Sequence, residues 1–336
     1  MRYIGVDLHT TQITVCYLTE NEEVAIQKYQ LCEIERFVRG LLISDEIAVE
    51  ATGNTRWFVE QVRSACGRVV LVNPRQFDVV KNSVKKTDRN DAINLALFLR
   101  ADMLPEVRAK KEEADKVQSL VGTRTKLVRL KTSLINKIHA LSVSNGRKLK
   151  KTSLGSEKGL EKVLKEEWTQ IERTELDIII EQIRSLKAGI KKLDAAIAEE
   201  SEKLAGYRNL ISISGIGSLS AGILLSVIGE VKDFANADKL ASYFGIVPRV
   251  SNSNETVNHG RITKHGNKTG RTTLVQCSLA AIKKNDYLRK YYEQVKARRG
   301  HGKAKIALAR KYLKIIYSTL TNNWVFADFN NFELAE

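Results

Sequence analysis

The stretch Tyr3–His9, which reads YIGVDLH, decides the fold of the first third of the chain, because it starts a series of strand-like segments. The next segment, Gln12–Leu18, alternates between apolar and polar residues and is rich in Ile, Val and Thr, as a half-buried strand is. Val24–Leu31 follows after a short connection and can form a third strand. The spacing predicts three strands in an antiparallel meander.

Helical and strand patterns alternate between this meander and about residue 105. Such alternation is typical of an α/β domain, which we expect over residues 1–105. Thr87 has a suitable side chain for the N-cap of the last predicted helix. The predicted elements are a helix over 34–42, a strand Glu46–Glu50, a helix around Trp57–Cys66, a strand Arg68–Val72 and a helix from Asp88 to about Ala101.

Four acidic residues stand where this pattern ends a strand or begins a helix. Asp7 follows the first strand and Glu50 ends a later one, whereas Asp88 and Asp91 are spaced to share the first turn of a helix. Carboxylates that converge repel one another, and a pair of Mg²⁺ or Mn²⁺ ions relieves that repulsion. Such ion pairs activate the attacking and leaving oxygens in phosphodiester chemistry. For each acid alone, a turn or helix-capping role is the alternative.

The rest of the chain has mainly helical patterns. Apolar residues at helical spacing predict long helices over about 112–144 and 160–204, so we expect region 106–206 to form a coiled coil for oligomerisation. Residues 207–336 are expected to form a mostly helical C-terminal domain. In that domain, Gly215-Ile216-Gly217 resembles a helix-hairpin-helix element, whose glycines let backbone amides approach a DNA phosphate. A plain tight turn is the alternative.

Positive charge is concentrated in the last third. The chain has a net charge of +16; residues 207–336 hold 20 Lys and Arg against nine Asp and Glu, whereas residues 1–100 hold 13 of each. This asymmetry indicates a polyanionic partner and favours a catalytic domain joined to a nucleic-acid-binding domain. The basic run Lys296–Lys305 fits either a nucleic-acid contact or a solvated helix face.

Several classes of protein are disfavoured. No segment has the length and apolar character of a membrane span, and the N-terminus does not resemble a signal peptide, so a cytoplasmic protein is expected. The cysteines form no CxxC pair, which argues against a disulfide framework or a zinc site. They are scattered along the chain as Cys16, Cys32, Cys66 and Cys277.

Several short motifs occur in the order found in one family of recombinases. On these motifs the chain resembles, over nearly its whole length, the DEDD transposases of the insertion sequence 110 family, which are relatives of the Piv DNA invertases. The motifs are VDLH at 6–9, EATG at 50–53, KTDRNDA at 86–92, LASYFGIVPR at 240–249 and GRITKHGN at 260–267.

The resemblance implies an RNase H-like (RuvC-like) N-terminal domain in which Asp7, Glu50, Asp88 and Asp91 bind two Mg²⁺ or Mn²⁺ ions. It also implies a nucleophilic serine, matched by Ser253 with Ser251 as the nearby rival, that attacks a DNA phosphate and forms a covalent intermediate. The implied partners are element-end and target DNA, a bridge-type guide RNA and further copies of the chain in a dimer or tetramer. Phosphate contacts are expected from the basic residues near that serine, Arg249, Arg261, Lys264, Lys268 and Arg271.

Three other functions fit parts of this sequence pattern. A nuclease of the Holliday-junction-resolvase type would use the same acids with water as the nucleophile. A non-catalytic nucleic-acid-binding protein would use them structurally, although their number and order argue against this. An actin-like sugar or acetate kinase also opens with Gly-x-Asp, but here only about 105 residues of α/β pattern precede the long helices, and a second Asp-Gly-Gly loop is missing.

Overall fold

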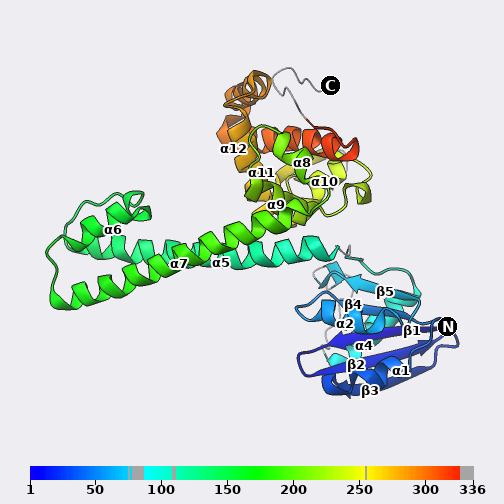
Figure 1. The fold of residues 1–336 in the computed structure, drawn as a ribbon. Coiled ribbons are helices and arrows are strands. Elements are labelled where there is room, and N and C mark those ends of the chain that lie inside the picture. Colours follow the sequence, from blue (N-terminus) through cyan, green and yellow to red (C-terminus); the bar gives the residue numbers. More distant parts are fainter. Residues whose placement is uncertain (75, 78–86, 108–110, 254–255, 326–336) are drawn as a thin grey trace. The chain divides into compact units, whose positions relative to one another are not determined.

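The computed structural model describes residues 1–336 except 75, 78–86, 108–110, 254–255 and 326–336. The chain divides into two compact units, Met1–Ala109 and Lys110–Glu336. The first unit is mixed α/β and the second is mostly helical, as the sequence predicted (Figure 1). No helix among the described residues is long and apolar enough to cross a membrane.

A five-stranded sheet forms the centre of the first unit, with the strand order β3-β2-β1-β4-β5. The first three strands form the predicted antiparallel meander, β4 runs parallel to β1, and β5 runs parallel to β4. Because β1 is the central strand, a residue at its end lies in the middle of one sheet edge. The strands are β1 (Arg2–Leu8), β2 (Gln12–Thr19), β3 (Val24–Gln30), β4 (Glu46–Glu50) and β5 (Arg68–Val72), close to the predicted ranges.

Helices cover both faces of this sheet (Figure 1). On one face, Phe37 and Phe58 are fully buried in a cluster with Val6 and the other apolar residues of that face. On the other face, Ala92 and Leu95 pack against the sheet. The first face is covered by α1 (Ile34–Arg39) and α2 (Thr55–Val62), and the second by α4 (Asp88–Arg100).

Helix α4 lies directly on β1 because residue 5 has no side chain. A Cβ at Gly5 would lie 2.0 Å from the Ala92 carbonyl oxygen and 2.6 Å from the Ala96 nitrogen. We predict that Gly5→Ala lowers the free energy of unfolding by at least about 2 kcal/mol, since the helix must move off the sheet. Urea unfolding followed by circular dichroism measures this. Gly53→Ala, in the same unit with nothing within 4 Å of its added Cβ, is the control and should change stability little.

The second unit begins with two long helices, α5 (Glu112–Ser144) and α7 (Gln170–Glu202), which pack side by side (Figure 1). They are antiparallel, since Arg124 pairs with Asp194 near one end and Asn145 donates to Glu172 near the other. The prediction of one continuous helix over 160–204 is wrong. It is interrupted after α6 (Glu157–Leu164), because Thr169 caps a new helix by accepting a hydrogen bond from the Glu172 nitrogen at 3.3 Å.

The remainder of the second unit is a helical cluster with one β-hairpin. Its core is continuous and includes the fully buried Tyr312 and Phe244. The hairpin was not predicted by the sequence analysis, which expected helices and loops here. The elements are α8 (Tyr207–Ser212), α9 (Ser218–Ile228), α10 (Ala237–Tyr243), β6 (Pro248–Ser253), β7 (Thr256–Ile262), α11 (Lys268–Ala281) and α12 (Asp286–Thr321).

Candidate active site

Asp7 and Glu50 lie at the same edge of the sheet, on adjacent strands. Val6 pairs with Val49 in the parallel ladder between β1 and β4, and the two acids are the residues that follow. Side chains alternate between the two faces of a strand. Because Gly5 faces α4 and Ala48 packs with residues of α4, Asp7 and Glu50 are on the face that α4 covers.

The first turn of α4 supplies the other two acids. Thr87 is the N-cap, as predicted, and its hydroxyl accepts a hydrogen bond from the Asn90 nitrogen at 3.2 Å. Asp88 and Asp91 both lie in this turn, where carboxylates interact favourably with the helix dipole. The side chain of Asp88 is 42% exposed, whereas Asp91 is buried. The close contact of Ala92 with Gly5 brings this turn towards the end of β1.

His9 joins this group from the loop that follows β1. Its Nε2 lies 3.1 Å from Asp7 Oδ2 and 3.5 Å from Asp88 Oδ1. One ligand atom from each of the three residues lies within 4.8 Å of the others, close enough to bind one metal ion. The loop itself is held by Asn54, whose side-chain amide donates to the His9 carbonyl oxygen at 2.7 Å.

The electrostatics of Asp7 favour a cation. Burial raises the pKa of Asp7 above its ordinary value, and the negative charges of Asp88 and Asp91 raise it further, although His9 acts in the opposite direction. A carboxylate that is disfavoured by its neighbours gains stability when a divalent cation binds, because the cation cancels the repulsion. Asp7, Asp88 and Asp91 are therefore near enough to interact, and a bound metal ion fits this donor set.

His9 has no metal-ligand spacing to other histidines or cysteines in the sequence, and only the structure shows it beside two of the acids. Asp7 and His9 are two residues apart, and the turn after β1 brings the imidazole back onto the carboxylate. The third partner, Asp88, is distant in the sequence, so spacing alone carries little signal. The only sequence signal is the Asp-x-His order at the end of a strand.

We predict that His9→Ala weakens Mn²⁺ binding by about tenfold, because the loss of a ligand or of a group that orients one typically costs roughly 10–100-fold. Calorimetric titration of the purified protein with Mn²⁺ measures this. The control is His139→Ala, a histidine on α5 in the other unit. Unchanged Mn²⁺ affinity in His9→Ala would exclude His9 from the metal site.

Ser253 and Ser251 both lie in β6 of the second unit. In the ladder with β7, Ser253 pairs with Thr256 and Ser251 pairs with Asn258. Residues 254 and 255, at the tip of the hairpin, lie outside the described residues. The predicted nucleophile therefore stands beside the tip of the hairpin, and its rival stands two positions further down the same strand.

The predicted phosphate-contacting residues differ in their surroundings. Arg249 on β6 and Lys268 at the start of α11 are exposed. Arg261 and Lys264 are also exposed, and they line a groove together with residues of α12. Arg271 is half-buried, and its Nη1 donates to the main-chain oxygens of Phe244 at 3.1 Å and Lys264 at 3.3 Å. Arg271 therefore holds the loop that carries Lys264.

The turn that resembled a helix-hairpin-helix element is partly committed to packing. Gly215 has a φ of +98°, and a Cβ there would lie 2.7 Å from the Cys277 carbonyl oxygen and 2.8 Å from the Ala281 nitrogen. The close approach that this glycine allows is thus to α11. Gly217 is the N-cap of α9, and an added Cβ there would meet no atom within 4 Å, so packing does not require a glycine at this position.

Comparison with known proteins gives two family matches. Residues 4–144, which contain all four acids and His9, match a family of DEDD transposases of IS110 elements described as "Transposase". Residues 207–293, which contain the β6–β7 hairpin, match a family described as "Transposase IS116/IS110/IS902 family". The first matched range thus contains the four acids, and the second contains Ser253.

Curated relatives are similar over nearly the whole chain. A "Probable family 20 transposase" of Pseudomonas aeruginosa is 26% identical over 95% of this chain and 96% of the relative. The transposase for insertion sequence element IS1111A of Coxiella burnetii is 26% identical over 96% of this chain and 90% of the relative. A pilin gene-inverting protein of Moraxella lacunata is 24% identical over 96% of both chains.

Proposed function

The chain belongs to the IS110 family of DEDD insertion-sequence transposases, and from this membership we propose that it cuts and rejoins DNA by metal-assisted phosphoryl transfer through a covalent serine–DNA intermediate. The observation that carries the proposal is the cluster at the edge of the first unit's sheet. There, burial and the carboxylates of Asp88 and Asp91 raise the pKa of Asp7. Glu50 stands at the end of the adjacent strand β4. Acids gathered in this way suit the binding of divalent cations.

We assign the first unit to the RNase H-like (RuvC-like) fold. Its sheet supports the assignment, because three antiparallel strands are followed by two parallel strands in the order β3-β2-β1-β4-β5. The acids at the ends of β1 and β4 and in the first turn of α4 then belong to one catalytic edge. We propose that the antiparallel pair α5 and α7 forms the coiled coil for oligomerisation.

Asp7, Glu50, Asp88 and Asp91 would hold the metal, proposed as two Mg²⁺ or Mn²⁺ ions, with His9 beside Asp7 and Asp88. Divalent ions bound there would polarise the scissile phosphate and stabilise negative charge on its oxygens. The protein residues do the positioning. The cap at Thr87 and the contact of α4 with Gly5 fix two of the acids relative to the third.

Ser253 is the proposed nucleophile. Its Oγ attacks the phosphorus of one DNA phosphodiester and loses its proton to solvent or a nearby base, and the bond from phosphorus to a deoxyribose oxygen breaks. That oxygen leaves as a hydroxyl, so a phosphoserine–DNA ester replaces the phosphodiester without an external energy source. A hydroxyl of a second DNA strand then attacks the ester, which joins the strands and frees Ser253.

The proposed partners are element-end DNA, target DNA and a bridge-type guide RNA. The basic charge of residues 207–336 supports a polyanionic partner for the second unit. A homo-oligomer, a dimer or a tetramer, is proposed from the family. Since its substrate is DNA, the protein would act in the cytoplasm, on the nucleoid.

The test incubates the protein, its co-expressed element RNA, labelled element-end DNA and target DNA with Mg²⁺, and runs the products on a denaturing gel. A labelled protein–DNA band that needs Mg²⁺ supports the proposal. Metal-dependent cleavage without such a band would indicate the resolvase-type nuclease that uses water. No cleavage with either Mg²⁺ or Mn²⁺ would contradict both.

A further inference from the structure

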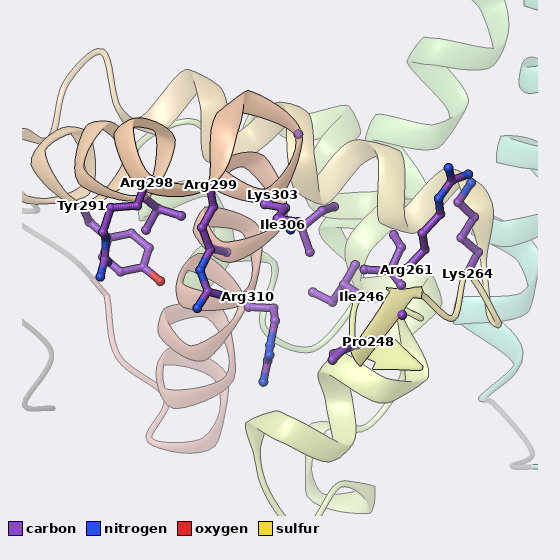
Figure 2. Close-up of a pocket in the computed structure, with 15 residues that line it drawn as sticks. Ile246, Pro248, Arg261, Lys264, Tyr291, Arg298, Arg299, Lys303, Ile306 and Arg310 are labelled. Atoms are coloured by element: carbon purple, nitrogen blue, oxygen red, sulfur yellow. The ribbon is translucent and has the colours of Figure 1, made fainter. Parts of the chain in front are cut away.

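A groove of about 940 Å³ lies in the second unit, where the β6–β7 hairpin faces α12 (Figure 2). Ligand-binding pockets commonly span roughly 300–1,000 Å³, so the groove can hold an extended ligand. We call it the basic groove, because its lining contains six cationic side chains and no acidic one. The cations are Arg261, Lys264, Arg298, Arg299, Lys303 and Arg310.

Most of this charge is not neutralised within the protein. Arg310 pairs with Asp238 at 3.2 Å. Within the part of the chain that the structure describes, the other five cations form no ion pair. Figure 2 shows Arg261 and Lys264 towards one end of the groove and Arg298 and Arg299 towards the other. Like charges that converge on one hollow repel one another, so an anion with several charges spread along its length would stabilise them.

The lining of the groove also contains apolar side chains, which we call its apolar floor. They include Ile246, Pro248, Val295 and Ile306. Tyr291 adds an aromatic ring at the end with Arg298 (Figure 2). In a duplex the bases are paired and stacked in the interior, and the backbone presents mainly phosphates to a basic surface. The bases of a duplex therefore cannot contact an apolar floor. Unpaired bases can, because they stack on aromatic side chains and pack on apolar ones.

Both walls of the groove are held in place. Helix α12 bends at Gly300, which has non-helical torsion angles, and a hydrogen bond between Tyr292 and His301 spans the bend. On the other wall, the loop with Lys264 is clamped to the end of α10. A Cβ at Gly245 would lie 1.9 Å from the His265 carbonyl oxygen. The cations are thus presented by a shaped surface and not by a straight solvated helix.

We propose that the basic groove binds a single-stranded segment of nucleic acid. Arg298 and Arg299 contact its phosphates at one end and Lys264 at the other, and an unpaired base lies on the apolar floor beside Tyr291. This proposal depends on the proposed function in one respect only, namely which nucleic acid supplies the single-stranded segment. DNA opened at an element end and a loop of a guide RNA have the same chemistry at this site.

The experiment measures the anisotropy of labelled oligonucleotides of one mixed sequence, as single-stranded DNA, single-stranded RNA and duplex DNA, in EDTA. We expect Arg298→Ala/Arg299→Ala to weaken binding of a single strand by about tenfold and to reduce the slope of log affinity against log salt by about 1.4, from two lost phosphate contacts. The preferred single strand, DNA or RNA, identifies its origin. Tighter binding of the duplex, with the same loss, would overturn the proposal.

Two controls separate this site from general charge. Arg289→Ala/Lys296→Ala removes two cations from the same helix, both exposed and paired with acids outside the groove, and should change affinity by less than about twofold. Tyr291→Ala should lose about fivefold through stacking, whereas Tyr291→Phe retains the ring and the affinity. Two outcomes would overturn the proposal. One is an equal loss of single-strand affinity in both double variants. The other is displacement of the labelled strand by polyglutamate at the same concentration of charges as an unlabelled oligonucleotide requires.

Failure here and failure of the proposed function are distinguishable. If Arg298→Ala/Arg299→Ala loses strand binding and the unmodified protein cleaves no DNA, the groove stands and the proposed function fails. If cleavage requires metal but the groove variant binds normally, the groove assignment fails alone.

Discussion

In the Asp7→Asn protein, metal-dependent cleavage of element-end DNA falls by at least roughly 10²–10³, while the metal-free protein becomes more stable. Asn has the shape of Asp without its charge, so it leaves the packing of β1 intact and removes a metal-binding oxygen anion. Loss of activity together with increased stability cannot come from unfolding. The two measurements are a denaturing gel with Mg²⁺ and thermal unfolding in EDTA.

The direction of the stability change follows from the pKa of Asp7. Burial and the charges of Asp88 and Asp91 raise the pKa of Asp7 in the folded protein above its unfolded value. A raised pKa means that protonated Asp7 stabilises the fold at pH values below the unfolded pKa, and this contribution is lost as the pH rises through the folded pKa. At neutral pH ionised Asp7 is therefore destabilising, and Asn, which is neutral at every pH, removes the penalty.

Thermal unfolding with added metal tests the same site in the opposite direction. Mn²⁺ should raise the melting temperature of the unmodified protein, because a ligand that binds only the folded state stabilises it. It should do so much less for Asp7→Asn. The control is Asp102→Asn, an acid just after α4 that is 86% exposed and has a left-handed φ of 52°, which Asn tolerates. Full cleavage by Asp7→Asn would remove Asp7 from the catalytic site.

Local patterns predicted the first unit well, because its central strands β1 and β4 are buried on both faces and are therefore short apolar runs. The segment around Val6 and Val49 is apolar enough to be central, and Thr87 carries the side chain of an N-cap. The order of strand ends then predicted which acids share an edge. This argument needs the alternation of side chains, which short sequences encode, and the parallel pairing of β1 with β4, which only the structure supplies.

Tertiary contacts explain what the sequence did not predict. His9 meets Asp88 only because α4 lies on Gly5, a contact between residues far apart in the chain. The basic run Lys296–Lys305 fitted a solvated helix face equally well, because helical periodicity cannot report the bend at Gly300 or the hairpin opposite it. The hairpin was missed because β6 and β7 are short and polar near their tip, with little of the apolar alternation that marks a strand.

A second variant, Ser253→Ala, tests which residue is the nucleophile. In the Ser253→Ala protein the denaturant-resistant protein–DNA band should disappear, and strand transfer should fall by more than about 10³, because the acids alone supply no protein atom that can form the phosphoester. Alanine keeps the Cβ and removes only one hydroxyl, so the pairing of residue 253 with Thr256 in the β6–β7 hairpin is retained. We therefore expect unchanged thermal stability and unchanged binding of element-end DNA.

Ser251→Ala is the matched control, since both serines lie in β6 two residues apart and pair with residues of β7. It should retain the covalent band. If the band disappears in Ser251→Ala and persists in Ser253→Ala, the nucleophile is Ser251 and the chemistry is otherwise unchanged. If both variants cleave DNA at the normal rate and Asp7→Asn does not, the attacking group is water, because the metal site is then sufficient for cleavage without either hydroxyl. The three variants together thus separate the identity of the nucleophile from the need for the acidic cluster, which no single variant can do.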